Sequence, residues 1–198
     1  MLMPWIREWQ DGIFLKKKHP GFIPILNKLP QDPFAISKRF YLKRGDSNIY
    51  RYGETPFRTL CRVAEQSEME IEDVVVDLGA GRGVSAHFFH YLIGCQVIAV
   101  EQIKEFIPRG GDEIEWVYGN YLNGDLPQGT IYYLYAPDLE DKAICALGKK
   151  IPRGALVISI SYPLSDYDRS FTLVSHFKAD FPWGSTDGFI ARKTVDHA

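Results

Sequence analysis

Three glycines and two carboxylates near the middle of the chain stand at a spacing that can form a ligand site. Asp77 precedes the run Gly79-Ala80-Gly81-Arg82-Gly83, and Glu101 lies 22 residues after Gly79. Because glycine has no Cβ, such a run lets the backbone turn sharply and approach a ligand closely. A carboxylate such as Glu101 can accept hydrogen bonds from both hydroxyls of a ribose. We therefore expect the glycine loop and Glu101 to hold a nucleoside.

The residues around this loop predict the elements that must position it. Val74–Val76 are consecutive β-branched residues, which is typical of a strand buried on both faces. The segment Val84–Leu92 suits a helix that Gly94 can end, and Gln96–Val100 is a second apolar run. Strand, glycine turn, helix, strand and acid is the layout of a nucleoside-cofactor site in an open α/β sheet.

The spacing of the glycines distinguishes between cofactors. A dinucleotide fingerprint would place its third glycine at position 84, where this chain has Val84. The pattern GxGxG, preceded by Asp77, instead resembles the first motif of the class I S-adenosylmethionine (SAM) methyltransferases. That resemblance implies that Asp77 faces the cofactor's amino group through the turn and that Glu101 binds its ribose. Two alternatives stay open: glycines that serve packing alone beside a solvated Glu101, and, less favoured, an NAD site.

The remaining strands predict the fold class. We expect an α/β, Rossmann-like sheet of seven strands, mostly parallel with a C-terminal antiparallel hairpin, as in class I methyltransferases. A helix is expected over residues 139–150, and a turn-rich FPWGST segment should join the strands of the hairpin. The later strands are predicted at Glu115–Tyr118, Thr130–Tyr135, Ala155–Ser161, Phe171–Lys178 and Gly188–Lys193.

Two of these strands end in polar or aromatic residues, and ligands of open α/β sheets lie beyond such ends. After the third strand, the amide oxygen of Asn120 can accept from an adenine amino group, and Tyr121 can stack near the ring. A turn asparagine beside an incidental aromatic is an almost equal alternative. After the fourth strand, we expect Tyr135 at the point of methyl transfer. Asp138 would orient the substrate or accept a proton.

Tyrosines gather around this predicted point of transfer. A tyrosine-lined, water-poor channel disfavours an ammonium ion and so lowers the pKa of an incoming amine. Tyr121, Tyr132, Tyr133 and Tyr135 are the candidates for such walls. Tyrosines along a strand are more often core residues than catalytic ones, so the core alternative is favoured for most of them.

The first 49 residues differ from the rest of the chain. Residues 1–50 hold nine Lys/Arg against four Asp/Glu, whereas residues 51–198 hold fourteen against twenty-one. We predict a basic, Pro-rich extension over 1–49, packed on or flanking a domain over 50–198. A helix is expected up to Lys18 and an extended, wrapping segment over residues 20–37. The basic charge could contact RNA or another acidic partner, or simply be solvated.

The segment YRYGETPF, which precedes the first strand, carries further candidates. Thr55 can cap a helix that begins at Pro56, a favoured first position. In class I methyltransferases this segment often closes over the methionine part of SAM. The resemblance therefore makes Tyr52, Glu54 and Thr55 candidate cofactor contacts, with a plain capped helix start as the alternative.

A narrower resemblance rests on YGETPF, VVDLGAGRG, AVEQ and TIYYLYAPDLED in that order, followed by GKKIPRGALVISIS. This order is similar to the histone-lysine methyltransferases that lack a SET domain, the telomeric-silencing disruptor type, and to small prokaryotic and mitochondrial protein-lysine methyltransferases. It covers about residues 50–162. It implies that Tyr52, Glu54 and Thr55 line the methionine end of SAM. The glycines that shape its loop would be Gly79, Gly81 and Gly83.

Departures from that pattern limit what it implies. The paired asparagines of the histone enzymes are replaced by Leu134 to Pro137, and the long N-terminal helical lobe is missing. The Asn/Asp-Pro-Pro-aromatic motif of base and glutamine amino methyltransferases is absent too. The favoured function is SAM-dependent methylation of a protein lysine. Methylation of RNA or of a small molecule is the first alternative, and a non-catalytic SAM-fold binding module is the second.

Composition excludes several other classes. Apolar residues make up 45% and charged residues 24% of the 198, as in ordinary globular proteins. No run approaches the length of a membrane span, and no secretory signal is present, so a cytoplasmic protein is expected. The three cysteines are far apart and form no CxxC, which predicts reduced thiols and no metal site.

Overall fold

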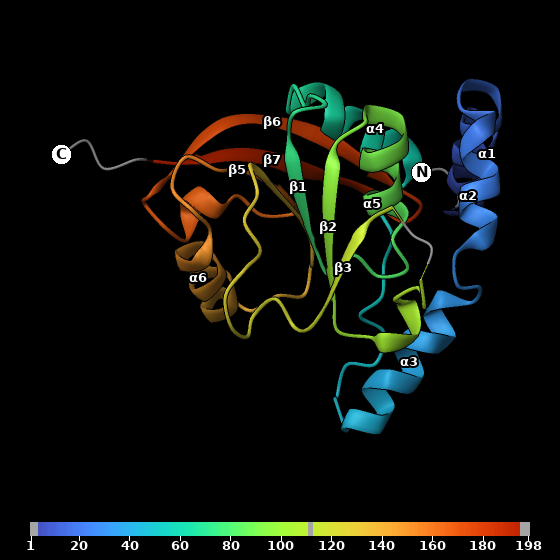
Figure 1. Ribbon diagram of the computed structural model, residues 1–198, viewed down its shortest axis with the longest axis horizontal. Coiled ribbons are helices and arrows are strands. Elements are labelled where there is room, and N and C mark those ends of the chain that lie inside the picture. The colour runs from blue at the N-terminus through green and yellow to red at the C-terminus, as the bar shows by residue number, and fades with distance from the viewer. Residues whose placement is uncertain (1–3, 111–112, 195–198) are drawn as a thin grey trace.

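A single seven-stranded sheet forms the centre of the structure, a computed structural model that describes residues 4–110 and 113–194 (Figure 1). The strand order is β3-β2-β1-β4-β5-β7-β6, with β1 to β5 parallel and β7 antiparallel to both β5 and β6. The predicted fold class is therefore confirmed. The strands are β1 Val74–Leu78, β2 Gln96–Glu101, β3 Glu115–Tyr118, β4 Ile131–Tyr135, β5 Leu156–Ile160, β6 Phe171–Phe181 and β7 Gly184–Lys193.

Helices cover both faces of this sheet. Helix α5 continues as a wider π turn over Phe89–Ile93 and ends at Gly94, which has a left-handed φ of 94°, as its sequence predicts. The turn between β6 and β7 is only residues 182–183, shorter than predicted. The α-helices are α1 Pro4–Lys18, α2 Ile23–Lys28, α3 Pro33–Arg44, α4 Phe57–Gln66, α5 Val84–Phe88 and α6 Asp141–Lys150.

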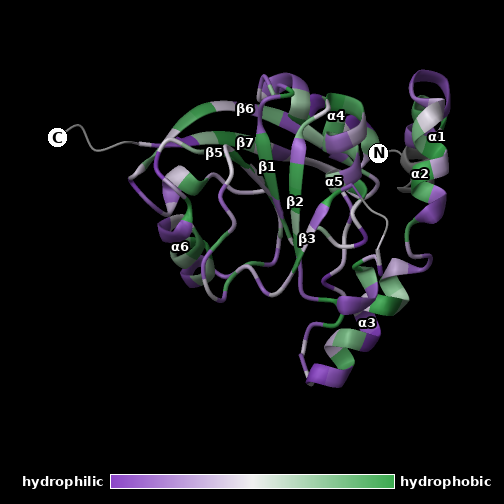
Figure 2. Ribbon diagram, in the orientation of Figure 1, coloured by the Kyte–Doolittle hydropathy of each residue, from purple (hydrophilic) through white to green (hydrophobic). Residues whose placement is uncertain are grey.

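The valines of β1 show how the sheet separates two cores. Val75 packs in one hydrophobic cluster with residues of α4 and α5, and Val76 packs in a second cluster with residues of α6. Both side chains are fully buried. Figure 2 shows β1 and β2 as largely hydrophobic ribbons within the sheet. A parallel strand between two helical layers must be apolar on both faces, which explains the unbroken valine run.

The segment over residues 20–37 is helical, so the prediction of an extended, wrapping segment is wrong. Pro24 and Pro33 occupy the first turns of α2 and α3, where a missing N–H leaves no intrahelical hydrogen bond unmade. The carboxylate of Asp32 caps α3 by accepting from the backbone N–H of Ala35 at 3.2 Å. Three of the four prolines of this segment therefore begin helical turns, and Pro30 lies in the short link between α2 and α3.

The N-terminus of α4 is capped from a distant helix, and the prediction of a Thr55 cap is wrong. The helix begins at Phe57, and the hydroxyl of Thr55 shares a 2.5 Å hydrogen bond with the phenol of Tyr133. The carboxylate of Asp11, in α1, accepts from the backbone N–H groups of Phe57 and Arg58, each at 2.9 Å. One carboxylate thus binds two of the four N–H groups that a helix leaves unpaired.

Apolar contacts also join the N-terminal helices to the core. Phe22 is 1% exposed, and its ring lies 5.6 Å from the ring of Phe57 and 6.5 Å from that of Phe88. Leu15 of α1 belongs to the same cluster.

Among the described residues, no helix has the length and apolar character needed to span a membrane.

We predict that replacing Asp11 with alanine lowers the free energy of unfolding by about 1–2 kcal/mol, because two backbone donors of α4 lose their acceptor. Urea denaturation of Asp11→Ala beside the wild type measures this change. The neighbouring substitution Gln10→Ala serves as the control and should have little effect. Equal stability of Asp11→Ala and wild type would show that the cap does not hold α1 on the core.

Candidate active site

The glycine loop lies at the carboxyl end of β1, beside the end of β2. Gly79, Gly81 and Gly83 have φ values of 82°, 58° and 91°, a left-handed conformation that favours glycine. A Cβ on Gly81 would lie 3.0 Å from a ring carbon of Tyr52. The absence of that Cβ lets the tyrosine ring rest directly on the loop. Tyr52 therefore covers the loop.

Glu101, at the end of β2, fixes the loop with its carboxylate. The side chain is 5% exposed; one oxygen accepts from the N–H of Gly81 at 2.8 Å and the other from the N–H of Ile103 at 2.7 Å. Burial raises the pKa of Glu101, and these backbone donors oppose that rise. Each carboxylate oxygen has two acceptor lone pairs, so each can still accept from a ligand hydroxyl.

A cavity of about 230 Å³ lies beside Glu101. The loop, the end of β2, the segment after β3 and helix α3 form its walls. The structure therefore brings together, around one cavity, predicted site residues from five separate segments. These are Tyr52, Gly79, Gly81, Glu101, Asn120, Tyr121, Tyr135 and Asp138.

A narrow space of about 20 Å³, lined by Asp77, Glu54 and Thr55, shares Tyr52 and Tyr135 with this cavity. Asp77 is 2% exposed, and its carboxylate accepts from the hydroxyl of Ser85 at 2.6 Å. Burial raises the pKa of Asp77 to about 7, the Ser85 hydrogen bond opposes the rise, and the charge of Glu101 adds to it. We call the 20 Å³ space the neck. Sequence reasoning missed Ser85, although a hydroxyl in the first turn of the helix after the loop is a visible signal.

An ion pair clamps the YGET segment onto the glycine loop. The guanidinium of Arg82 donates to both carboxylate oxygens of Glu54, at 2.6 and 2.9 Å, and the Tyr52 hydroxyl donates to the same carboxylate at 2.5 Å. Arg82 also donates to the carbonyl of Pro30 at 3.4 Å. Arg82 was not predicted as a site residue; an arginine inside a GxGxG loop was its only sequence signal. It joins the loop, the YGET segment and the N-terminal extension.

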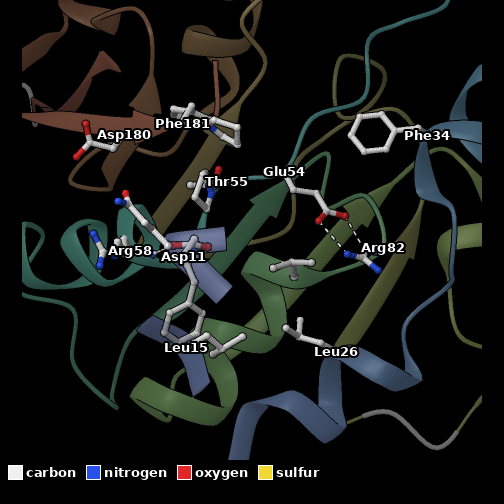
Figure 3. Close-up of a pocket in the computed structure, with 15 residues that line it drawn as sticks. Asp11, Leu15, Leu26, Phe34, Glu54, Thr55, Arg58, Arg82, Asp180 and Phe181 are labelled. Carbon is white, nitrogen blue, oxygen red and sulfur yellow. Dashed lines mark hydrogen bonds and ion pairs between the residues drawn. The ribbon is translucent and has the colours of Figure 1, made fainter. Parts of the chain in front are cut away.

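A second cavity, of about 500 Å³, is lined by both residues of this clamp and lies between the N-terminal helices and the core (Figure 3). It shares Glu54, Thr55 and Val84 with the neck. Figure 3 shows the Glu54–Arg82 pair on one side of the cavity and Asp11 with Arg58 on another. Glu54 of the clamp therefore borders both the neck and a cavity large enough for a small molecule.

The tyrosines of β4 are divided between the two faces of the sheet. Tyr133 and Tyr135 border the neck, whereas Tyr132 is buried among the residues near α6 and its hydroxyl donates to the carbonyl of Pro127 at 2.7 Å. Successive side chains of a strand point to opposite faces, so Tyr132 cannot line the same channel. The core alternative, which was favoured for most of these tyrosines, therefore applies to Tyr132.

Three other predicted residues have partners that restrict their roles. The amide oxygen of Asn120 accepts from the N–H of Leu122 at 2.9 Å, a turn contact that leaves it one lone pair. Asp138, at the cavity rim, pairs with Arg51 at 3.3 Å. Gly83 lines neither the cavity nor the neck; its left-handed φ and the 2.9 Å that a Cβ would leave to Trp116 both favour glycine there.

Comparison with known proteins agrees with this arrangement at the level of the fold. No family model and no curated protein matches the sequence. Among solved structures, an RNA methyltransferase from Salinibacter ruber in complex with S-adenosyl-L-homocysteine (SAH) is similar, with 18% identity over 74% of this chain and 97% of its own, at a TM-score of 0.59. The chain has the fold of the class I methyltransferases.

Other structures with this methyltransferase fold differ in chemistry. The N-methyltransferase NodS from Bradyrhizobium japonicum WM9, also in complex with SAH, is 13% identical over 80% of this chain and all of its own, with a TM-score of 0.58. The [4+2]-cyclase SpnF is 12% identical over 70% of this chain and 80% of its own, with a TM-score of 0.56. Because one fold carries different reactions, the function must be argued from the site.

The clamp predicts an energetic coupling between residues 54 and 82. We expect a double-mutant cycle with Glu54→Gln and Arg82→Met to give a coupling of about 1–3 kcal/mol in the free energy of unfolding, because the pair is bidentate and only 26% and 18% exposed. The exposed pair Arg62 and Asp180, treated in the same way, is the control and should give at most about 1 kcal/mol. Equal couplings for the two pairs would contradict a clamp.

The raised pKa of Asp77 predicts a pH-dependent stability. An unfolded aspartate titrates near 3.9, so between about pH 4 and pH 7 the folded state holds a proton that the unfolded state has lost. Wild-type stability should therefore fall across this range relative to Asp77→Asn and then stay level above about pH 7. Urea denaturation of both proteins at pH 5, 6, 7 and 8 measures the difference between their free energies of unfolding. A difference that stays constant with pH would contradict the raised pKa of Asp77.

Proposed function

We propose that the protein is a SAM-dependent methyltransferase. The observation that carries this proposal is the buried carboxylate of Glu101, which is bonded to the glycine loop and faces a cavity of about 230 Å³. A carboxylate with one free lone pair on each oxygen suits the two hydroxyls of a ribose. Asp77 in the neck suits the ammonium of an amino acid, since an opposite charge would favour its ionised form. Glu101 thus suits the ribose at one end of SAM, and Asp77 suits the ammonium at the other end.

When bound, SAM supplies an electrophilic methyl group together with its own leaving group. The residues of this chain then have to align the acceptor and exclude water. Tyr135 borders both the cavity and the neck, and its ring packs 4.8 Å from that of Phe181. Burial raises the pKa of Tyr135, so its phenol stays protonated and supplies a neutral wall. We assign Tyr135 to the alignment of the acceptor.

We further propose that the acceptor is the amine of a protein lysine. A lysine must lose its proton before it attacks, and burial among aromatic rings lowers its pKa. The aromatic stack of Tyr135, Phe181 and Trp183 provides such surroundings, with Trp183 56% exposed at the tip of the hairpin. Asp138 at the rim is placed to orient the incoming cation, although its ion pair with Arg51 must then rearrange.

RNA is the second candidate acceptor. The basic composition of residues 1–50 and the fold shared with an RNA methyltransferase both favour it. The overall acidic charge of residues 51–198 opposes it, because phosphate contacts dominate the affinity of nucleic-acid binding.

Calorimetric binding of SAM and SAH to wild type and Glu101→Ala tests the cofactor. We expect micromolar binding by the wild type and a loss of at least tenfold in the variant, because the ribose hydroxyls lose their charged acceptor. Asp180→Ala, an exposed carboxylate outside the 230 Å³ cavity, is the control. Lack of binding by the wild type would contradict the proposal.

Transfer of labelled methyl groups to fractionated lysate, followed by protease or nuclease, tests the acceptor. Label that protease releases, and that amino-acid analysis finds on lysine, would support the proposed substrate. Label that only nuclease releases would replace it with RNA.

A further inference from the structure

Helix α3 of the N-terminal extension presents one face to the cavity beside Glu101. Ser37, Tyr41 and Arg44 line that cavity, and their spacing of four and three residues places them on the same side of the helix. Leu42, on another side, is 54% exposed. The extension is therefore a wall of the cavity as well as a neighbour of the core.

The hydroxyl of Ser37 lacks a hydrogen bond that its burial calls for. Ser37 is 1% exposed, and within the part of the chain that the structure describes its oxygen has no hydrogen-bond partner. Buried hydroxyls nearly always have a partner, because an unpaired one loses its bonds to water without replacement. The hydroxyl of this serine, in the wall of the cavity, therefore has hydrogen-bonding capacity left for a polar group of a ligand.

Two hydrogen bonds hold α3 in place against the end of β2. The side-chain amide of Gln102 donates to the Tyr41 hydroxyl at 3.2 Å, and Arg44 donates to the amide oxygen of Gln102 at 3.2 Å. Gln102 directly follows Glu101, the proposed ribose ligand. These two hydrogen bonds fix the position of α3 relative to the carboxylate of Glu101. Ser37 and Glu101 can therefore contact the same ligand.

We propose that α3 is part of the nucleoside site and that the Ser37 hydroxyl hydrogen-bonds to the nucleoside half of the cofactor. The inference rests on the proposed function and deepens it. Ser37 lines the cavity that holds Glu101 and Asn120 but not the neck with Asp77. The contact is therefore made to the part that SAM, SAH and adenosine share, and the extension takes part in cofactor binding.

The test compares Ser37→Ala with wild type in two measurements. Calorimetry with SAH and with adenosine should show binding weakened about threefold to tenfold, by a similar factor for both ligands, because one neutral hydrogen bond is lost. Thermal unfolding without ligand should show an unchanged or higher midpoint, because an unpaired buried hydroxyl is removed and alanine favours a helix. Leu42→Ala, on the exposed side of α3, is the control and should bind both ligands as the wild type does.

The two measurements separate this inference from a structural role and from the proposed function. A lower unfolding midpoint of the unliganded variant would mean that Ser37 serves the fold, which would overturn the inference. Unchanged affinity for both ligands, or a loss for SAH alone, would overturn it as well. Lack of binding by the wild type would instead remove the proposed function itself.

Discussion

The burial of one carboxylate organises the candidate site. Glu101 is nearly removed from water, and a buried carboxylate is stable only when donors replace its hydration. The donors are the N–H groups of Gly81, in the loop after β1, and of Ile103, in the turn after β2. The same carboxylate therefore joins two neighbouring strand ends and sets the shape of the cavity between them. Gly81 has a left-handed φ of 58° in this arrangement, which favours glycine at that position.

The N-terminal extension takes part in this arrangement at three separate points. Asp11 caps the helix that follows the YGET segment, the carbonyl of Pro30 accepts from Arg82 of the glycine loop, and Tyr41 bonds to the residue after Glu101. The first contact fixes the start of α4, and the other two bridge polar groups of the extension to segments that line the cavity. Segments distant in sequence thus restrict the loop, the YGET segment and the end of β2 together.

The features that the sequence predicts well are those that local physical rules determine. The valine run, the glycine spacing and Glu101 lie within one strand-turn-helix-strand unit, so periodicity and turn chemistry suffice to place them. The prolines of residues 20–37 were misinterpreted, because proline interrupts a helix interior yet favours a first turn, and only the position of each helix start tells the two apart.

Apart from the Ser85–Asp77 hydrogen bond, the contacts that sequence reasoning missed are long-range. Asp11 lies 46 residues before the backbone N–H of Phe57 that it binds, and Thr55 was assigned that role because it is the nearest residue with a suitable side chain. Arg82 lies 28 residues from Glu54. No local pattern states which distant carboxylate will meet a given donor; the packing of α1 and of the YGET segment on the core decides it. The burial of Ser37 in the wall of the 230 Å³ cavity likewise depends on the packing of α3 on the core, which no local pattern states.

The electrostatics of the site favour a cationic ligand. Burial raises the pKa values of both Asp77 and Glu101, and the charge of Glu101 adds to the rise at Asp77. Two buried carboxylates in one region repel each other, and a bound cation would relieve that repulsion and favour their ionised forms. Proton release and cation binding are then reciprocally linked: the cation lowers the pKa of Asp77, and ionisation of Asp77 strengthens binding of the cation. SAM carries a sulfonium and an ammonium, whereas SAH carries the ammonium alone. Under the proposed function, this charge difference between SAM and SAH would give the site a physical means to hold SAM more tightly than SAH as Asp77 ionises.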